Sequence, residues 1–318
     1  MESVTPGIPS LFVTVPTVQL ADDVRALLPP QAADRVEIAV WSMDAPAPRE
    51  HLDMVVPPYM SMARVLGRIE GVDVRLVQGQ SIGYEGVEDL LPDGLAFANA
   101  SSVHETSTAE LAVALTLASQ RRIPAFVRAQ DEGRWAPEFA TSLADRRVLL
   151  LGYGGVGKAI AARLAPFEVE LVAVARSARN EDGMPVHATD ELPALLGDAD
   201  IVVVSLPGGD DTRHIVDNAF LEALPDGALI VNVGRGGLID TEALVDHVGR
   251  GRIRAALDVT DPEPLPPDHP LWSLPGVLIS PHVGGASTAM QPRIARLVSR
   301  QIERMLAGES PLNVVIGG

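Results

Sequence analysis

A glycine-rich turn constrains the fold of this chain more than any other segment. It runs Gly152-Tyr153-Gly154-Gly155-Val156-Gly157, follows the apolar run 148–151 and precedes an Ala-rich helical pattern over 158–165. In a strand, G-x-G-x-x-G turn and helix, the three glycines allow a tight turn, close approach of a pyrophosphate and close helix–strand packing. The N–H groups at the helix start then bind the phosphates. This order predicts a dinucleotide-binding unit, with Gly152, Gly154, Gly155, Val156 and Gly157 as candidate cofactor-binding residues.

The composition indicates a globular chain of two domains. At 318 residues the chain is too long for one ordinary core. Its 47% hydrophobic and 21% charged residues are typical of globular proteins. No apolar run approaches the roughly 18 residues of a membrane span, and residues 1–6 do not begin a signal peptide. The absence of cysteine excludes disulfides and thiolate chemistry. We expect a cytoplasmic protein.

The charge of the chain limits its partners. A formal net charge of −17 argues against nucleic acid or an anionic membrane surface as a partner. Because a dinucleotide is also an anion, its site must be built locally from glycine backbone, helix ends and a few arginines. The histidines lack metal-ligand spacing, and His104-Glu105 lacks the second histidine of H-E-x-x-H. No metal site is predicted.

Strand-like and helix-like patterns alternate from residue 148 onward. Further strands are predicted at 170–175, 201–206, 228–233, 253–257 and 277–280, and helices at 191–196, 221–224 and 241–248. Continuous Val/Ile/Leu runs alternating with helices indicate a parallel sheet covered on both faces, with right-handed crossovers.

The first hundred residues repeat this pattern in a smaller unit without a glycine turn. Strands are predicted at 11–15, 36–40, 53–56, 74–77 and 95–98, and helices at 24–28 and 60–69. A helix with Ser107 as N-cap and Glu110 completing a capping box would connect the two units, with Pro124 after its end. A last helix, 290–307, would return to the first unit.

We therefore expect an α/β protein of two doubly wound parallel-sheet domains. Residues 101–285 would form a Rossmann dinucleotide-binding domain. Residues 1–100 plus 286–318 would form a smaller flavodoxin-like substrate domain.

Four polar residues follow strands of the larger predicted sheet. Arg235 follows strand 228–233, Asp258 ends strand 253–257 with Glu263 just beyond, and His282 follows strand 277–280. Ligands of open α/β sheets bind at the carboxyl ends of the strands, so these side chains should converge on the edge that carries the glycine turn. Taken alone, Arg235 is more simply interpreted as a surface arginine and Glu263 as a solvated loop carboxylate. His282 alone has the alternative of a satisfied histidine at a strand end. Together, they indicate a catalytic site.

The sequence around Arg235, Glu263 and His282 resembles the D-isomer-specific 2-hydroxyacid dehydrogenase family, and the resemblance covers nearly the whole length of the chain. Residues 105–115 and 257–266 look most like glyoxylate/hydroxypyruvate reductases. The resemblance implies that a nicotinamide delivers hydride to a 2-oxo carbon and that Arg235, Glu263 and His282 are catalytic.

The residue types suit this chemistry. His282 would be the proton donor in reduction, because imidazole titrates near neutrality. Glu263 would hydrogen-bond the other ring nitrogen and favour imidazolium, and Arg235 offers a planar fork to a carboxylate or a polarised carbonyl. The resemblance further implies that Asp258 accepts from the nicotinamide carboxamide. The remaining positions that it implies along the cofactor path are Leu206, Pro207, Val233, Gly234 and Gly284.

The substrate carboxylate has a candidate loop at 78–84. By resemblance, the backbone N–H groups of Ser81, Ile82 and Gly83 would hold it, together with Arg235 and His282. Tyr84 and Glu85 depart from the family pattern, and an ordinary turn is the alternative interpretation.

The strand end at 175 bears on the choice of cofactor. NAD sites place Asp or Glu about 20 residues beyond the glycine turn, but Ala175 stands there. No carboxylate repels a 2′-phosphate, while Arg176, Ser177 and Arg179 can bind one. These residues predict NADP, with NAD as the alternative and a solvated basic loop as the competing interpretation.

The predicted function is NADP-dependent reduction of a small 2-oxo acid, of the glyoxylate or hydroxypyruvate type, to the D-2-hydroxy acid. The resemblance also implies a homodimer with 107–120 near its interface. Two alternatives stay open: a nucleotide-sensing, corepressor-like binding protein of the same fold, and a formate or phosphite dehydrogenase. Cofactor binding without NADPH oxidation would indicate the first, and oxidation of those anions the second.

Overall fold

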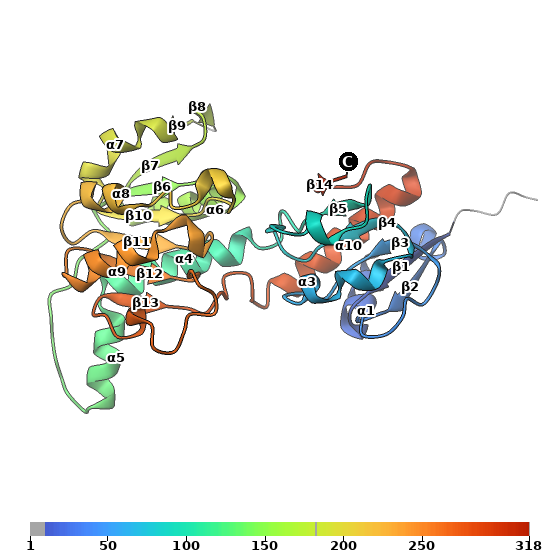
Figure 1. The fold of residues 1–318 in the computed structure, drawn as a ribbon, viewed down its shortest axis with the longest axis horizontal. Coiled ribbons are helices and arrows are strands. Elements are labelled where there is room, and N and C mark those ends of the chain that lie inside the picture. Colours follow the sequence, from blue (N-terminus) through green and yellow to red (C-terminus); the bar gives the residue numbers. More distant parts are fainter. Residues whose placement is uncertain (1–9, 182, 318) are drawn as a thin grey trace, which may run out of the picture. The chain divides into compact units, whose positions relative to one another are not determined.

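The computed structural model describes residues 10–181 and 183–317, which form two compact units. One unit contains the chain up to His104 and from Thr288 onward, and the other spans Glu105–Ser287. Figure 1 shows that each is built on its own sheet with helices packed against it.

The sheet of the 105–287 unit has eight strands in the order β13-β12-β11-β10-β6-β7-β9-β8. Their bounds are β6 Arg147–Leu151, β7 Glu170–Ala175, β8 Arg179–Glu181, β9 Met184–Ala188, β10 Ile201–Val204, β11 Leu229–Asn232, β12 Arg254–Leu257 and β13 Val277–Ile279. All neighbouring strands are parallel except β8, which forms an antiparallel hairpin with β9. From β9 to β12 this is the doubly wound order 3-2-1-4-5-6, in which strand order reverses between β6 and β10.

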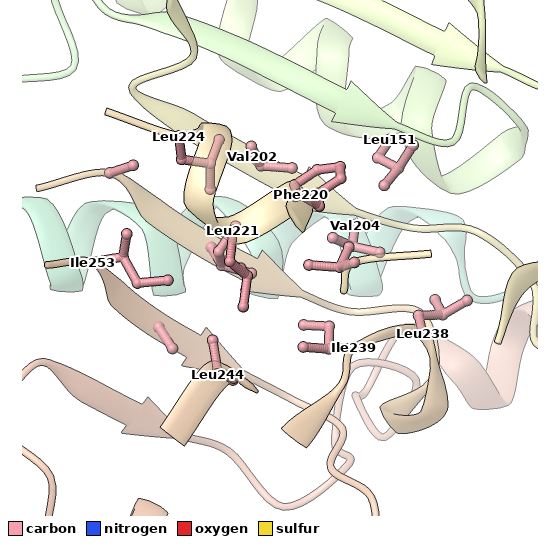
Figure 2. Packing of buried hydrophobic residues seen from close by; sticks show 14 of the residues in the cluster. Leu151, Val202, Val204, Phe220, Leu221, Leu224, Leu238, Ile239, Leu244 and Ile253 are labelled. Atoms are coloured by element: carbon pink, nitrogen blue, oxygen red, sulfur yellow. The ribbon is translucent and has the colours of Figure 1, made fainter. Parts of the chain in front are cut away.

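Helices cover both faces of this sheet. They are α4 Glu105–Gln120, α5 Ile123–Asp131, α6 Gly155–Leu164, α7 Leu192–Leu195, α8 Asn218–Ala223 and α9 Thr241–Gly249. Buried side chains of α4 and α6 pack with one face, and those of α7, α8 and α9 pack with the other. Figure 2 shows this second core, where Phe220 and Leu221 of α8 lie against Val202 and Val204 of β10. Burial of these side chains drives formation of the layers.

The sheet of the other unit has six strands in the order β14-β5-β4-β3-β1-β2. Their bounds are β1 Leu11–Val15, β2 Val36–Val40, β3 His51–Val55, β4 Asp73–Gln78, β5 Ala96–Ala98 and β14 Val314–Ile316. The helices are α1 Val18–Leu27, α2 Pro30–Ala33, α3 Met62–Val65 and α10 Met290–Ala307. Strands β1 to β5 are parallel in the order 2-1-3-4-5, a second doubly wound arrangement, and β14 adds an antiparallel edge.

Short 3₁₀ turns complete both units: Leu66–Ile69, Glu88–Leu90, Ala165–Phe167, Thr189–Glu191, Leu196–Asp198, Asp210–Thr212, Gly236–Leu238 and Pro270–Trp272. No helix within the described part of the chain is both long enough and apolar enough to span a bilayer.

The predicted fold class, α/β with two mostly parallel sheets, is confirmed. Three strands and the last helix have the predicted ends: 11–15, 36–40, 170–175 and 290–307. The glycine-turn helix begins at Gly155, three residues before its predicted start. The predicted helix 60–69 is α3 followed by a 3₁₀ turn, and 191–196 is likewise divided between α7 and flanking 3₁₀ turns.

The predicted N-cap at Ser107 is wrong. Helix α4 begins at Glu105, so Ser107 lies buried in its first turn. This turn packs closely against the start of α6, since a Cβ on Gly155 would lie 3.0 Å from Cγ of Glu105. Pro124 lies in the first turn of α5, where its missing N–H removes no helical hydrogen bond.

The hairpin β8–β9 and strand β14 were not predicted. Arg179, expected in a loop, lies in β8, where Arg179-Asn180-Glu181 is polar and has no alternating apolar pattern. Backbone pairing with β9 forms this strand.

Candidate functional site

The glycine turn connects β6 to α6 at the point where the strand order reverses. Gly152 has a φ of +112°, and a Cβ there would lie 2.9 Å from the backbone nitrogen of Leu206. A Cβ on Gly157 would lie 2.0 Å from the Gly152 carbonyl oxygen, so only glycine lets α6 start this close to β6. Gly154, the N-cap of α6, has no side-chain cap, and a Cβ there would meet nothing within 4 Å. The open, uncapped helix start therefore fits the diphosphate of a dinucleotide.

The segments after β10 and β11 lie beside this turn. A Cβ on Gly234 would lie 2.7 Å from the carbonyl oxygen of Leu206, which in turn contacts Gly152. Pro207 is exposed and Val233 is buried. The structure thus brings three of the predicted cofactor-path segments together at one edge of the sheet.

The predicted 2′-phosphate residues follow β7. Ala175 ends that strand buried, and Arg176 and Ser177 are exposed immediately after it. Arg179 donates from Nη2 to the carbonyl oxygen of Tyr153 at 3.2 Å, so the hairpin is tied to the glycine turn. It also pairs with the carboxylate of Glu181 at 2.8 Å.

His282 and Glu263 form a direct pair. Nδ1 of His282 lies 2.5 Å from Oε1 of Glu263, and each side chain is a little over two-fifths exposed. Because a carboxylate only accepts, Nδ1 carries the hydrogen and Nε2 is the ring atom left for other chemistry. The hydrogen bond to Glu263 raises the pKa of His282 above its usual value, against partial burial, which lowers it. The same hydrogen bond lowers the pKa of Glu263.

Arg235 lies within electrostatic reach of this pair. Its charge lowers the pKa of both Glu263 and His282. The buried amide of Asn232 shapes the turn: Nδ2 donates to the Arg235 carbonyl at 2.9 Å, and Oδ1 accepts from the Gly234 N–H at 3.0 Å. A cavity of about 190 Å³ lies beside Arg235, lined by Gly208, Gly209, Asp210, Arg213, Gly237 and Leu238. The imidazole and its acidic partner are therefore in contact, and the charge of Arg235 acts on both.

Asp258 holds the loop that carries His282. Asp258 is buried, with 3% of the residue exposed. Oδ1 accepts from the Ser280 hydroxyl at 2.7 Å and the Val283 N–H at 2.9 Å, while Oδ2 accepts from the Gly284 N–H at 2.9 Å. The Asp258 carbonyl accepts from the His282 N–H at 2.7 Å. These bonds fix the left-handed backbone of His282, whose φ is +53°.

This role of Asp258 was not anticipated. The three hydrogen bonds use three of the roughly four acceptor sites of its carboxylate, which leaves one for the nicotinamide carboxamide that the resemblance implies. Ser280 directly follows β13 and was predicted only as the last residue of the strand 277–280, without a role of its own. Its position beside a buried carboxylate at a strand end is the signal that could have identified it.

The predicted substrate loop lies in the other unit. Its carbonyl oxygens point into the fold: that of Ser81 accepts from the Ala100 N–H at 2.8 Å, and that of Ile82 from Asn99 Nδ2 at 2.8 Å. Within the described part of the chain, the N–H groups of Ser81, Ile82 and Gly83 donate no hydrogen bond. Successive unpaired N–H groups of this kind form an anion-binding nest.

Buried polar side chains support this loop, although His104 was considered from the sequence only as a metal ligand and Gln78 and Gln301 were given no role. His104 lies 2.5 Å from the Gln80 carbonyl through Nε2 and stacks on Tyr59 with ring centroids 5.6 Å apart. Gln78 donates to the carbonyls of Gly79, Ala98 and Asn99 and accepts from Gln301. No hydrophobic periodicity marks such residues, so only their burial in the fold identifies them.

In residues 10–181 and 183–317, no group of three or more His, Asp or Glu side chains is arranged to hold a metal ion.

A larger cavity, of about 530 Å³, lies at the opposite, amino edge of the sheet, where Arg254 begins β12 and Val277 begins β13. It is therefore remote from the glycine turn.

Comparison with known proteins places this geometry in a family. Residues 113–284 match the family model "D-isomer specific 2-hydroxyacid dehydrogenase, NAD binding domain". The chain is 31% identical over 318 residues to the glyoxylate reductase/hydroxypyruvate reductase of Mus musculus, covering 94% of this chain and 95% of the mouse protein. It is also 32% identical over 250 residues to a glyoxylate reductase of Thermofilum pendens, covering 75% of this chain and 74% of the relative.

Solved structures agree with this assignment. A D-isomer specific 2-hydroxyacid dehydrogenase from Xanthobacter autotrophicus, in complex with NADPH and MES, is 29% identical with a TM-score of 0.79, covering 97% of this chain and 98% of that one. An NADPH-dependent glyoxylate/hydroxypyruvate reductase from Sinorhizobium meliloti, in complex with NADP and malonate, is 26% identical with a TM-score of 0.77, covering 98% of each chain. The chain belongs to the D-isomer specific 2-hydroxyacid dehydrogenase family and is an NAD(P)-dependent oxidoreductase.

Proposed function

We propose that this enzyme reduces a small 2-oxo acid, of the glyoxylate or hydroxypyruvate type, to the D-2-hydroxy acid with NADPH. The observation that carries the proposal is the pairing of His282 with Glu263 at 2.5 Å beside Arg235, on the strand edge that bears the glycine turn. Similarity to the mouse and archaeal reductases supports the substrate class. The cofactor, when bound, supplies the hydride.

His282 moves the proton. With Nδ1 committed to Glu263, Nε2 of the imidazolium gives its proton to the substrate oxygen as the 2-oxo carbon becomes a hydroxyl-bearing carbon. The raised pKa of His282 keeps the donor form populated near neutral pH. Glu263 orients the ring and stabilises its charge, and Asp258 holds the backbone on which the ring is mounted.

Two groups bind and orient the substrate in this proposal. The guanidinium of Arg235 holds the carboxylate or polarises the 2-oxo group, for which its planar fork is suited. The N–H groups of Ser81, Ile82 and Gly83 bind the carboxylate. This role is supported by the carbonyl oxygens of Ser81 and Ile82, which already accept hydrogen bonds within the fold.

The 2′-phosphate of NADPH is bound by Arg176, Ser177 and Arg179, and two structural relatives contain NADPH or NADP.

A spectrophotometric screen tests the proposal. Purified enzyme is assayed with NADPH and with NADH against a panel that includes glyoxylate, hydroxypyruvate and bulkier 2-oxo acids. We expect oxidation of NADPH to be fastest with the small acids. Tight NADPH binding without turnover of any acid would refute the reductase and favour a nucleotide-sensing protein, and a clear preference for NADH would refute the cofactor assignment.

We further propose a homodimer. The side chains of α4 pack largely within their own unit, but apolar side chains are exposed just beyond, on α5 and the segment after it. Ile123 and Val127 are about half exposed, and Trp135 and Phe139 are fully exposed. An exposed apolar surface of this kind favours burial against a partner, and we place the interface there.

A further inference from the structure

The hairpin beside the glycine turn carries a carboxylate in a place where the linear sequence showed none. Glu181 ends β8 and accepts a hydrogen bond from Nζ of Lys158, in the first turns of α6. It also accepts from Nε of Arg179 at 2.9 Å and pairs with Nη2 of the same residue at 2.8 Å. Ala175 occupies the usual position of an acid, but Glu181 brings one to the side of the glycine turn from β8, which is separated from β7 by β9 in the sheet.

The carboxylate of Glu181 is paired with Arg179, the cation that is predicted to bind a 2′-phosphate. The other contacts of Arg179 are made by Nη1 to the Ser177 carbonyl at 3.3 Å and by Nη2 to the Tyr153 carbonyl at 3.2 Å. Each nitrogen of the guanidinium thus has an acceptor within the protein. A phosphate on the ribose must share or displace the carboxylate to use this fork.

Arg176 contrasts with Arg179. It is exposed after β7, and within the described part of the chain it makes no hydrogen bond or ion pair. The two arginines predicted from sequence as equivalent 2′-phosphate ligands therefore differ, because one is available and the other is already paired.

The charge at this location depends on Glu181. Hydrogen bonds from Lys158 and Arg179 lower the pKa of Glu181, so it is ionised at neutral pH. The three side chains then carry a combined charge of about +1, while a bound phosphate monoester carries about −1.5 to −2. The carboxylate both repels this phosphate and competes for its partners.

We propose that Glu181 is a specificity-determining residue that competes with the cofactor 2′-phosphate for Arg179 and Lys158. It thereby limits the preference for NADPH and keeps NADH usable. This inference rests on the proposed use of Arg176, Ser177 and Arg179 as the 2′-phosphate site.

The test is the variant Glu181→Gln, which keeps the shape of the side chain and removes its charge. Calorimetric titration with 2′,5′-ADP and with 5′-AMP measures the 2′-phosphate contribution without turnover. We expect the Kd for 2′,5′-ADP to fall about fivefold, the effect of one exposed ion pair, while that for 5′-AMP is unchanged. The ratio of kcat/KM for NADPH over NADH should rise by a similar factor, and less at high salt.

Glu170→Gln is the matched control. Glu170 pairs with Arg147 at 3.3 Å at the opposite end of β7, so the variant makes the same change in net charge far from the turn. It should leave both nucleotide affinities at the wild-type values. If Glu181→Gln behaves like this control, or weakens 2′,5′-ADP, the competition does not exist.

Arg176→Ala separates this inference from the function on which it rests. The proposed 2′-phosphate site requires that this variant bind 2′,5′-ADP more weakly and 5′-AMP unchanged. No effect of Arg176→Ala would overturn the site itself. A weakening by Arg176→Ala together with no gain from Glu181→Gln would overturn only the competition.

Discussion

At the scale of single residues, the site depends on one short hydrogen bond between a histidine and a glutamate. Their types and order were predictable, because parallel strands bring their carboxyl ends to one edge. The 2.5 Å contact of His282 with Glu263 and the nearby charge of Arg235 agree with that expectation. Glu181 was not predictable in the same way, since β8 has no apolar pattern and Glu181 meets Lys158 of α6 only in the folded chain.

Glu263→Gln should shift the pH dependence of reduction. The hydrogen bond that His282 donates to Glu263 raises the pKa of His282, so the imidazolium is present below that pKa and is lost as pH rises through it. An amide removes the stabilising charge, and the falling limb of kcat/KM should move to lower pH. At pH 8 we expect a loss of about 10²-fold, and a smaller one at pH 6. Identical pH profiles for the two enzymes would refute the pairing as the cause.

At the scale of elements, local pattern predicted a structure well where one periodicity dominated. The α10 pattern of apolar residues at helical spacing marks Met290–Ala307 with both ends correct. Where side chains are polar or structure depends on distant partners, pattern was insufficient. The sequence around Ser107 has the form of an N-cap, yet α4 begins earlier, at Glu105. The first turn of the helix is stabilised by packing of Glu105 against the start of α6.

Gly157→Ala and Gly154→Ala should separate packing from cofactor binding. A Cβ on Gly157 would lie 2.0 Å from a carbonyl oxygen, whereas one on Gly154 would meet nothing within 4 Å. Gly157→Ala should lower the free energy of unfolding by about 2 kcal/mol, because α6 must move. Gly154→Ala should keep the wild-type stability and weaken NADPH binding. Urea unfolding and calorimetry measure the two effects, and equal stability losses would contradict the assignment.

Asp258→Asn should loosen the loop after β13. The amide offers one acceptor oxygen in place of two, and its NH₂ group would face a backbone N–H that now donates to Oδ1 or Oδ2. We expect a loss of about 2 kcal/mol in the free energy of unfolding and a fall in kcat larger than that of Ser280→Ala, which removes one hydrogen bond only. If kcat is unchanged, the carboxylate does not position His282.

At the scale of the whole molecule, two doubly wound sheets divide the predicted site residues between two units. Ser81, Ile82 and Gly83 lie in the unit that ends at His104, and the glycine turn, Arg235 and His282 lie in the other. The strand alternation of the sequence was enough to predict both sheets except for β8, β9 and β14. The polar network of Gln78, Gln301 and His104 was not predictable, because residues 223 positions apart meet only in the folded chain.

Self-association should depend on α5 and the segment that follows it. In light scattering after size exclusion, we expect the wild type at twice the 33.6 kDa chain mass and Trp135→Ser/Phe139→Ser near one chain mass. Trp272→Ser, which removes an aromatic side chain that is about half exposed elsewhere in the unit, is the control and should stay dimeric. A wild-type monomer would contradict the proposed dimer.

His282 is proposed to transfer the proton during reduction of a 2-oxo acid, and the variant His282→Ala removes the group that would do so. The rate constant kcat for the best acid of the screen and the Kd for NADPH are measured on the same preparation. We expect kcat to fall by about 10³-fold while the Kd for NADPH stays at the wild-type value. A variant that retains the wild-type kcat would contradict this role of His282.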